Sequence, residues 1–380
     1  MPDVFESILG QPQVREFLRA TIAGGKVSHA YLFTGPAGSN KTQAAYAFAQ
    51  AILCEEHGCM SCECCKRVAR RKHPDVRYIA PEGTDGYLVD QVRNVAADTS
   101  LAPIQASKKV YILDRVDLLG TEAANAFLKT LEEPPQDVVL ILLGRTRDAV
   151  LPTIVSRCQV VPFRHIPTSE AAGILSQNTG ASAQMASIAI WACGGSITKA
   201  VEFLKSRERM AFRSQVLEAL ASLAWADDWD ILSYSEKLVL AAKAPLDSVR
   251  ATQAEEMAES ADFLAKSALR QLEERNKRAL TAATLESLRQ MTAIMRSWLR
   301  DVLMVRAGCE QLVVNADVLA AIRQAAQAAD EAHLSAALEA CRRADEAIAY
   351  FVSPQTCIDA LLLEIREVLY DTNSTYKAAV

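Results

Sequence analysis

The sequence predicts an α/β module of the P-loop type followed by helical regions. Its first 165 residues alternate short β-rich runs with helical patterns, which is typical of a parallel sheet covered by helices. The first of these runs leads directly into a phosphate-loop motif. After Pro162 the β-type runs nearly vanish, and an alanine-rich helical pattern continues to the end. The predicted strands are apolar and largely free of Gly and Pro, and they lie at 30–34, 76–79, 110–113 and 138–143.

The pattern divides the chain into three predicted domains. We expect residues 1–165 to form a nucleotide-binding-like domain with a cysteine-rich loop inserted at 54–65. Residues 166–207 are predicted to form a small helical lid containing the turn signal Gly194-Gly195-Ser196. Residues 208–380 are predicted to form a helical C-terminal domain that ends in a polar, frayed tail at 371–380.

Six apolar residues of the C-terminal domain recur at a 3-4-3-4-3 spacing, which places them on one face of a helix. This face is either the interior of a helical bundle or an exposed contact with another subunit, and the bundle interior is the favoured interpretation. The six residues are Leu288, Met291, Met295, Trp298, Val302 and Val305.

Composition places the chain among ordinary folded proteins. With 380 residues, 50% of them apolar and 23% charged, it is long enough for two or three domains. A net charge of −5 argues against wrapping nucleic acid over the whole surface. The longest apolar runs, such as 138–143, are too short to span a bilayer, and residues 1–10 lack the features of a secretory signal. We therefore expect a cytoplasmic protein without a membrane partner.

The phosphate-loop motif runs from Gly35 to Thr42, between the predicted strand at 30–34 and a helix predicted at 43–53. In such a loop backbone N–H groups surround the phosphates, Lys41 reaches the β- and γ-oxygens, and Thr42 holds Mg²⁺. Asn40 departs from the pattern, which has Gly there, although Asn tolerates a positive φ better than most residues. A loop that binds ATP and an inherited loop that no longer binds it both remain open. The candidate nucleotide-binding residues are Gly35, Gly38, Asn40, Lys41, Thr42 and Asp114.

Asp114 follows the predicted strand at 110–113, where its carboxylate could position Mg²⁺ directly or through water. Hydrolytic P-loop proteins of this class usually carry Glu at the next position to activate the attacking water. This chain has Arg115 there, which cannot accept a proton at physiological pH. Asp117 is an alternative base, although the helix predicted after it would aim it differently. We therefore expect little or no autonomous ATP hydrolysis.

Five of the ten cysteines fall within residues 54–65. Four thiolates in one short loop match the soft ligands that a tetrahedral structural zinc needs, and four sulfurs leave no open position for a substrate. Cys64 and His57 remain alternative ligands, and reduced cysteines without metal remain the alternative to a zinc site. The predicted zinc ligands are Cys54, Cys59, Cys62 and Cys65.

Five of the seven residues at 66–72 are basic. A solvated helix face and a DNA contact are both compatible with this run. No aromatic residue is interleaved to stack on bases, so the solvated face is the favoured interpretation.

Longer motifs extend over nearly the whole chain. They are Leu9-Gly10-Gln11, residues 28–35, the cysteine cluster followed by His73-Pro74-Asp75, residues 125–135, and residues 151–158 with Ser156-Arg157-Cys158. In this order they resemble the delta-prime subunits of the bacterial DNA polymerase III clamp loader, which belong to the AAA+ superfamily. The resemblance implies an AAA+ module with an inserted zinc loop, a small lid, and a collar of C-terminal helices that joins five subunits in a ring.

The resemblance also implies a role for Arg157 in trans, as an arginine finger on ATP bound by a neighbouring tau/gamma subunit. A rigid guanidinium beside the γ-phosphate stabilises the charge that develops during phosphoryl transfer. The implied partners are the tau/gamma and delta subunits in a heteropentamer, the sliding clamp and, through the complex, primed DNA.

Three departures from the hydrolytic tau/gamma pattern favour a subunit that hydrolyses ATP poorly or not at all. Arg115 replaces the catalytic glutamate, Asn40 replaces a loop glycine, and Thr198 stands where active relatives place a sensor arginine. We expect such a subunit to support ATP-dependent loading of the clamp, without independent activity. The alternatives are an active tau/gamma-type ATPase that relies on Asp117, and a DNA-binding module built on the zinc loop and the basic run.

Overall fold

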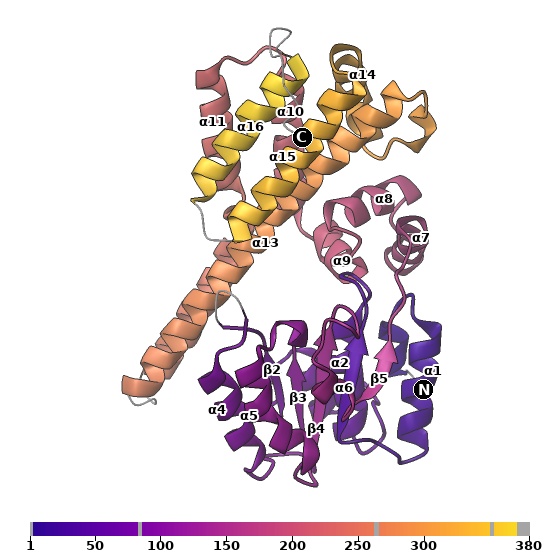
Figure 1. The fold of residues 1–380 in the computed structure, drawn as a ribbon, viewed down its shortest axis with the longest axis vertical. Coiled ribbons are helices and arrows are strands. Elements are labelled where there is room, and N and C mark those ends of the chain that lie inside the picture. The colour runs from indigo at the N-terminus through magenta and orange to yellow at the C-terminus, as the bar shows by residue number, and fades with distance from the viewer. Residues whose placement is uncertain (1–2, 83–85, 262–265, 350–352, 371–380) are drawn as a thin grey trace. The chain divides into compact units, whose positions relative to one another are not determined.

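A computed structural model describes residues 3–82, 86–261, 266–349 and 353–370 (Figure 1). They form two compact units. The first contains the chain up to Ile174 together with Gly195–Thr198, and the second contains Leu175–Gly194 and the chain from Lys199 onward. The finer division into three domains stays a prediction, and the predicted tail at 371–380 lies outside the described residues.

The first unit is built around a five-stranded parallel sheet. Its strands are β1 (Ala30–Thr34), β2 (Val76–Ile79), β3 (Lys109–Leu113), β4 (Val138–Gly144) and β5 (Gln159–Pro162). Their order is β2-β3-β4-β1-β5, and every neighbouring pair is parallel, which confirms the predicted sheet. Strands β1, β3 and β4 are buried along their whole length, so their sequences are nearly continuous apolar runs.

Helices cover both faces of this sheet because side chains alternate along each strand. Phe33 and Ile112 face one core with α2 (Lys41–Leu53). Leu32 and Leu113 face a second core with α5 (Thr121–Glu132). The other helical segments of this part of the chain are η1 (Val4–Ser7), α1 (Pro12–Ala23), α3 (Glu63–Ala69), α4 (Val89–Thr99), η2 (Val116–Leu118), α6 (Pro152–Val155) and α7 (Thr168–Thr179), which crosses into the second unit.

The described part of the second unit is helical. Its central helix is α13, which packs against α10, α14 and α15, while α16 packs against α15 and α11. Of the six periodic residues, five are buried in this bundle and Val305 is half-buried, which confirms the predicted core. The helices are α8 (Ala183–Ala192), α9 (Ile197–Lys205), α10 (Arg207–Ser222), α11 (Asp228–Ala241), η3 (Ala244–Leu246), α12 (Asp247–Ala261), α13 (Lys266–Arg306), η4 (Glu310–Leu312), η5 (Ala316–Val318), α14 (Leu319–Ala328), α15 (Glu331–Ala349) and α16 (Pro354–Tyr370).

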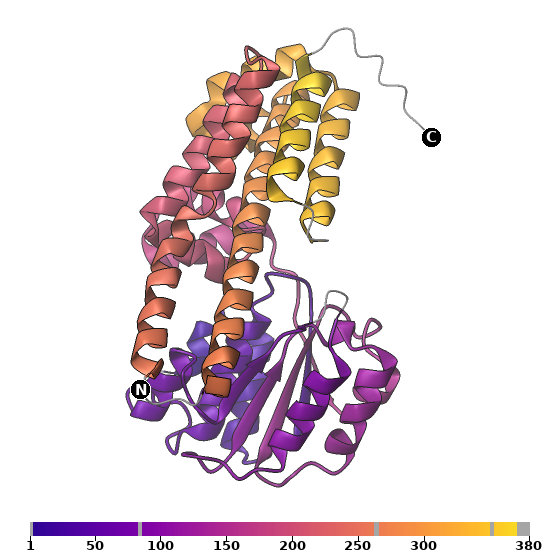
Figure 2. The ribbon, with the colours of Figure 1, turned by 90° about the vertical axis from the view of Figure 1, so that its left-hand side faces the viewer.

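Helices α12 and α13 form an antiparallel hairpin that the sequence did not predict. Figure 2 shows α12 beside the N-terminal half of α13, and this hairpin extends past the other helices of the second unit. Among the described residues, no helix combines the length and the apolar character that crossing a bilayer requires.

Candidate functional site

The phosphate loop lies between β1 and α2, and its glycines are required by close backbone packing. A Cβ atom on Gly35 would lie 2.6 Å from the carbonyl oxygen of Phe163. Gly38 has φ +78°, and a Cβ atom there would lie 3.1 Å from the carbonyl oxygen of Gly195. Gly35 therefore excludes larger residues because a side chain has no space there. Gly38 excludes them both by space and by its positive φ.

Asn40 adopts the conformation that the motif usually assigns to Gly. Its backbone is left-handed, with φ 72° and ψ 20°. Its side chain accepts a hydrogen bond from the Thr198 hydroxyl at 3.0 Å and donates one to the carbonyl oxygen of Leu9 at 3.4 Å. Asparagine is among the few residues that tolerate this region, so the departure from the motif leaves the turn in place and ties it to neighbouring segments.

The Lys41 ammonium group lies against the loop that would hold the phosphates. Its Nζ atom donates to the carbonyl oxygens of Gly35 and Pro36, the latter at 2.8 Å, and to the Ser39 hydroxyl at 3.2 Å. Burial lowers the pKa of Lys41 to about 8, while the charge of Asp114 acts in the opposite direction. The carboxylate is therefore close enough to the loop to act on its lysine.

Asp114 follows β3, and its carboxylate is held by a tyrosine of the neighbouring strand. Its Oδ2 atom accepts a hydrogen bond from the Tyr78 hydroxyl at 2.7 Å. Arg115 comes next with a left-handed backbone, φ 51°, and starts η2. Asp117, the alternative base, accepts a hydrogen bond from the backbone N–H of Arg145 at 3.3 Å. The position after Asp114 thus carries a cation, not a proton acceptor.

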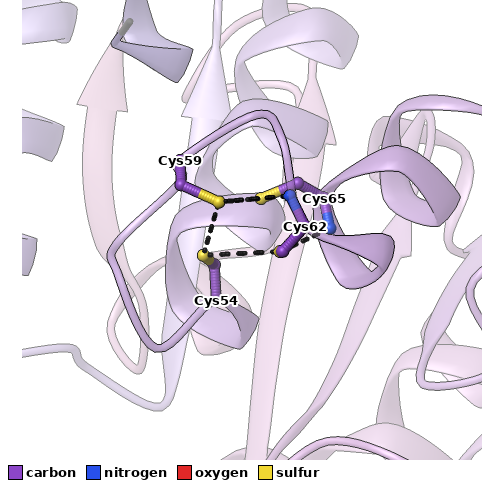
Figure 3. Close-up of side chains that lie close together, drawn as sticks. All are labelled: Cys54, Cys59, Cys62 and Cys65. Atoms are coloured by element: carbon purple, nitrogen blue, oxygen red, sulfur yellow. Dashed lines mark hydrogen bonds between the residues drawn. The ribbon is translucent and has the colours of Figure 1, made fainter. Parts of the chain in front are cut away.

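The four predicted zinc ligands converge on one point at the C-terminal end of α2 (Figure 3). The Sγ atom of Cys54 lies 3.7 Å from that of Cys59 and 3.8 Å from that of Cys62. The Sγ atoms of Cys59 and Cys65 are 4.0 Å apart. A tetrahedral zinc ion with Zn–S bonds of about 2.3 Å separates its sulfurs by about 3.8 Å, so the arrangement fits a metal of this kind.

Backbone and hydroxyl groups stabilise the Cys59 thiol as an anion. The Cys59 Sγ atom accepts hydrogen bonds from the Ser61 hydroxyl at 3.4 Å and from the N–H of Cys62 at 3.3 Å. These donors, the hydroxyl above all, lower the pKa of Cys59 to about 6. Neither Cys64 nor His57 belongs to the group of ligands found among the described residues, and burial raises the pKa of Cys64 to about 11.

The basic residues that follow the cysteine cluster make several contacts within the first unit. Lys66 pairs with Glu63 at 3.3 Å, Arg67 donates to Gln105 at 2.8 Å, and Arg71 lies over the Tyr46 ring at 4.9 Å. These contacts agree with a folded helix face more than with a DNA-binding surface.

Asp75 fixes the loop beside the cysteine cluster. It is buried, and its carboxylate accepts hydrogen bonds from the N–H groups of Ile104, Gln105 and Ala106 at 2.7–2.8 Å. Burial alone would raise the pKa of Asp75, but the three donors outweigh it and hold the pKa below its usual value. The side chain is therefore an anchor for the chain between α4 and β3.

Arg157 lies just after α6, and its side chain bonds to neighbours outside the phosphate loop. Within the described residues its guanidinium donates to the carbonyl oxygen of Thr153 at 2.8 Å and to the Ser156 hydroxyl at 3.2 Å, and it pairs with Glu132 of α5. About a third of the side chain is exposed (32%), so the group can be reached from outside.

Comparison with known proteins identifies the family. A family model described as "DNA polymerase III, delta subunit" matches residues 10–167, and one described as "DNA polymerase III, delta subunit, C terminal" matches residues 263–367. Together the two matches take in well over half of the chain. The chain belongs to the clamp-loader subunit family of DNA polymerase III. The first of these models matches the part of the chain that forms the five-stranded parallel sheet and the phosphate loop.

Individual relatives include both tau and delta-prime subunits. The DNA polymerase III subunit tau of Bacillus subtilis (strain 168) is 40% identical over 174 residues, which are 45% of this chain and 30% of that protein. Subunit delta' of the same organism is 37% identical over 157 residues, 40% of this chain and 47% of that protein. The chain thus spans less than half the length of these relatives. A solved gamma subunit-related protein of Thermotoga maritima is 17% identical, with a TM-score of 0.48 over 92% of this chain and 98% of that one.

The structure places the predicted motifs on one parallel sheet and its connections. The phosphate loop and Asp114 follow the carboxyl ends of β1 and β3, and the four cysteines form one cluster. Sequence reasoning assigned no role to Tyr78, Asp75 or Glu132. Asp75 and Glu132 were visible only as parts of family motifs, and Tyr78 is recognisable only once strand register is known.

Proposed function

We propose that the chain is a clamp-loader subunit that hydrolyses ATP poorly or not at all and supplies Arg157 in trans to a neighbouring ATPase subunit. In this role it supports ATP-dependent loading of the sliding clamp onto primed DNA. The observation that carries the proposal is Arg115, which follows Asp114 where a water-activating glutamate would be needed. A guanidinium cannot take a proton from water at physiological pH, so the chain's own site lacks a base.

The surroundings of Arg157 suit a group that acts on another subunit. Its guanidinium is held near the surface by Thr153, Ser156 and Glu132. An ion pair between partly exposed groups is weak, about 1 kcal/mol or less, so a γ-phosphate presented by a neighbour could replace Glu132 at little cost. The planar guanidinium would then stabilise charge on the transferring phosphoryl group.

The chain's own loop fits a nucleotide with Mg²⁺. The hydroxyl of Thr42 and the carboxylate of Asp114 are the hard oxygen ligands that Mg²⁺ prefers, and bound Mg²⁺ would neutralise charge on the phosphates. Lys41 would exchange its contacts with the loop carbonyls for phosphate oxygens. Asn40 would keep the loop in its left-handed turn. In this proposal nucleotide binding supports assembly of the subunit, not turnover.

A structural zinc ion held by the four cysteines is part of the proposal. Thiolate ligands, the tetrahedral sulfur spacing and the absence of an open coordination position agree with zinc. The ion would stabilise the segment between α2 and α3.

The helical unit is proposed to join the collar of a heteropentamer with tau/gamma and delta subunits. Large apolar side chains are exposed on it: Trp225 (78%), Trp229 (78%) and Leu240 (69%). Trp229 and Leu240 belong to α11 and Trp225 precedes it. Exposed aromatic and apolar groups of this size are typical of protein contact surfaces.

The test is a reconstituted loader in which only the subunit adjacent to this chain retains an active phosphate loop. We expect Arg157→Ala to lower DNA-stimulated ATP turnover at least about 1,000-fold, the lower end of the scale of a lost arginine finger. Arg147→Ala, which removes another exposed arginine of the same unit, is the matched control and should leave turnover unchanged. Assembly is checked by size-exclusion chromatography. Unchanged turnover in an assembled Arg157→Ala loader would reject the role in trans.

A tau/gamma-type ATPase is the second candidate, favoured by the 40% identity to a tau subunit and by intact Lys41, Thr42 and Asp114. In that case Asp117 would have to act as the base, although it accepts a backbone N–H. Steady-state turnover by the purified chain, lost in Lys41→Ala and in Asp117→Asn, would establish this candidate. We expect no such turnover.

A further inference from the structure

We propose that Tyr78 is a positioning residue for Asp114, and that its hydroxyl aims the carboxylate at the Mg²⁺ site of the phosphate loop. The inference rests on the proposed binding of a nucleotide by this loop. It concerns a residue of β2 that lies outside the phosphate loop and the aspartate motif.

The register of the sheet brings the two side chains together. Tyr78 pairs with Ile112 across β2 and β3, and the N–H of Asp114 donates to the carbonyl oxygen of Ile79 at 2.8 Å. Ile112 and Asp114 are two residues apart, so their side chains leave the same face of the sheet. Tyr78 therefore lies diagonally beside Asp114, and its hydroxyl reaches the Oδ2 atom at 2.7 Å.

Helix α2 fixes the tyrosine ring from the other side. Tyr46 stacks on Tyr78 with ring centroids 6.2 Å apart and an angle of 21° between the planes. Tyr46 is one helical turn after Thr42, so the stack stands beside the hydroxyl proposed to hold the metal. The Arg71 guanidinium also lies over the Tyr46 ring, 4.9 Å from its centroid. The Tyr78 side chain is 42% exposed, and this ring stack together with the hydrogen bond to Asp114 sets the position of its hydroxyl.

The hydrogen bond leaves the carboxylate able to bind a cation. A phenol donates one hydrogen, and it is received by Oδ2, so Oδ1 keeps its lone pairs. The second oxygen of the Asp114 carboxylate therefore remains available to a cation.

Tyr87 provides a matched control. Its hydroxyl donates to the backbone carbonyl oxygens of Asp114 at 2.5 Å and Ile79 at 3.0 Å. It supports the same residue through the main chain and does not touch the carboxylate. Removing the Tyr87 hydroxyl eliminates hydrogen bonds to the main chain and leaves Oδ2 of Asp114 bonded to Tyr78. Removing the Tyr78 hydroxyl releases Oδ2 and leaves the main-chain bonds of Tyr87 in place.

The experiment measures how strongly Mg²⁺ improves the affinity of the full chain for N-methylanthraniloyl-ATP. Dissociation constants are determined by fluorescence titration in excess MgCl₂ and in EDTA, and their ratio is the readout. In Tyr78→Phe, which keeps the ring stack, we expect the ratio to fall about fivefold to tenfold, the scale of one ordinary hydrogen bond. The affinity in EDTA should not change. Tyr87→Phe and Tyr46→Phe should keep the wild-type ratio.

Other outcomes overturn the inference. An unchanged ratio in Tyr78→Phe means that the hydroxyl does not position the carboxylate, and a higher ratio means that it competes with the metal. An equal fall in Tyr87→Phe indicates a general structural effect. A wild-type chain that binds no nucleotide also overturns the inference, but it leaves the role of Arg157 intact because that role uses ATP held by a neighbour.

Discussion

The two ends of helix α2 carry two loops that are built on different principles. At its C-terminal end Cys54 caps the helix, and the other three cysteines of the cluster follow within residues 59–65. At its N-terminal end the phosphate loop depends on distant segments, since Thr198 bonds Asn40 and Tyr78 bonds Asp114. The candidate metal cluster is therefore specified locally by residue type and spacing, whereas the candidate nucleotide site depends on contacts between segments distant in sequence.

The largest effect is expected at the cysteine cluster, at the C-terminal end of α2. Cys62→Ser removes one of four ligands, and we expect zinc content to fall from about one ion per chain to none. Loss of several kcal/mol of metal-linked stability should lower the melting temperature by on the order of 10 °C. Metal content is measured by atomic emission and stability by calorimetry.

The control for this comparison is Cys64→Ser, which changes a thiol in the same loop outside the ligand group. It should retain its zinc and most of its stability. Metal loss in Cys64→Ser, or metal retention in Cys62→Ser, would show that the ligand set differs from the cluster in Figure 3.

A smaller effect is expected at the other end of α2. Asn40→Val puts a β-branched residue at φ 72° and removes the bonds to Thr198 and Leu9. We expect a loss of about 1–3 kcal/mol in unfolding free energy, measured by urea denaturation. Asn40→Gly keeps the backbone conformation and loses only the side-chain bonds, so it should cost about 1 kcal/mol. Equal costs for the two variants would mean that backbone conformation is not what Asn40 contributes.

The smallest effect concerns pH. Burial lowers the pKa of Lys41 to about 8, so the ammonium that attracts phosphate is present below this pH and lost above it. Nucleotide affinity should therefore weaken several-fold between about pH 7 and pH 9, as followed by fluorescence titration. Lys41→Arg cannot lose its charge in this range, and its affinity should stay level. A wild-type affinity that is constant with pH would contradict the lowered pKa.

Much of the first unit was predictable because its signals are local. The strands β1 and β2 have the predicted bounds, and β3 and β4 each extend one residue beyond them. Strand β5 was missed because Gln-Val-Val-Pro has only two apolar residues, between a polar residue and Pro, and such a run is too short to be recognised as a strand.

The candidate site shows the same limit. Spacing alone indicated the four cysteines, and Asn40 could be recognised as a residue that tolerates a left-handed turn. The contacts of Tyr78 with Asp114 and of Glu132 with Arg157 depend on strand register and on packing between segments distant in sequence. Such contacts follow from topology, which a local pattern does not contain.

Helix α13 has 41 residues, so it is about 60 Å long, and only part of it lies in the bundle. From Ser287 to Val302 it is largely buried, whereas its first half has α12 as its helical neighbour. One continuous helix can therefore open in two steps, because local unfolding follows packing and not helix boundaries. In hydrogen–deuterium exchange the amides of α13 before Ser287 should exchange rapidly. The α13 amides around Trp298 should exchange only when the whole second unit unfolds.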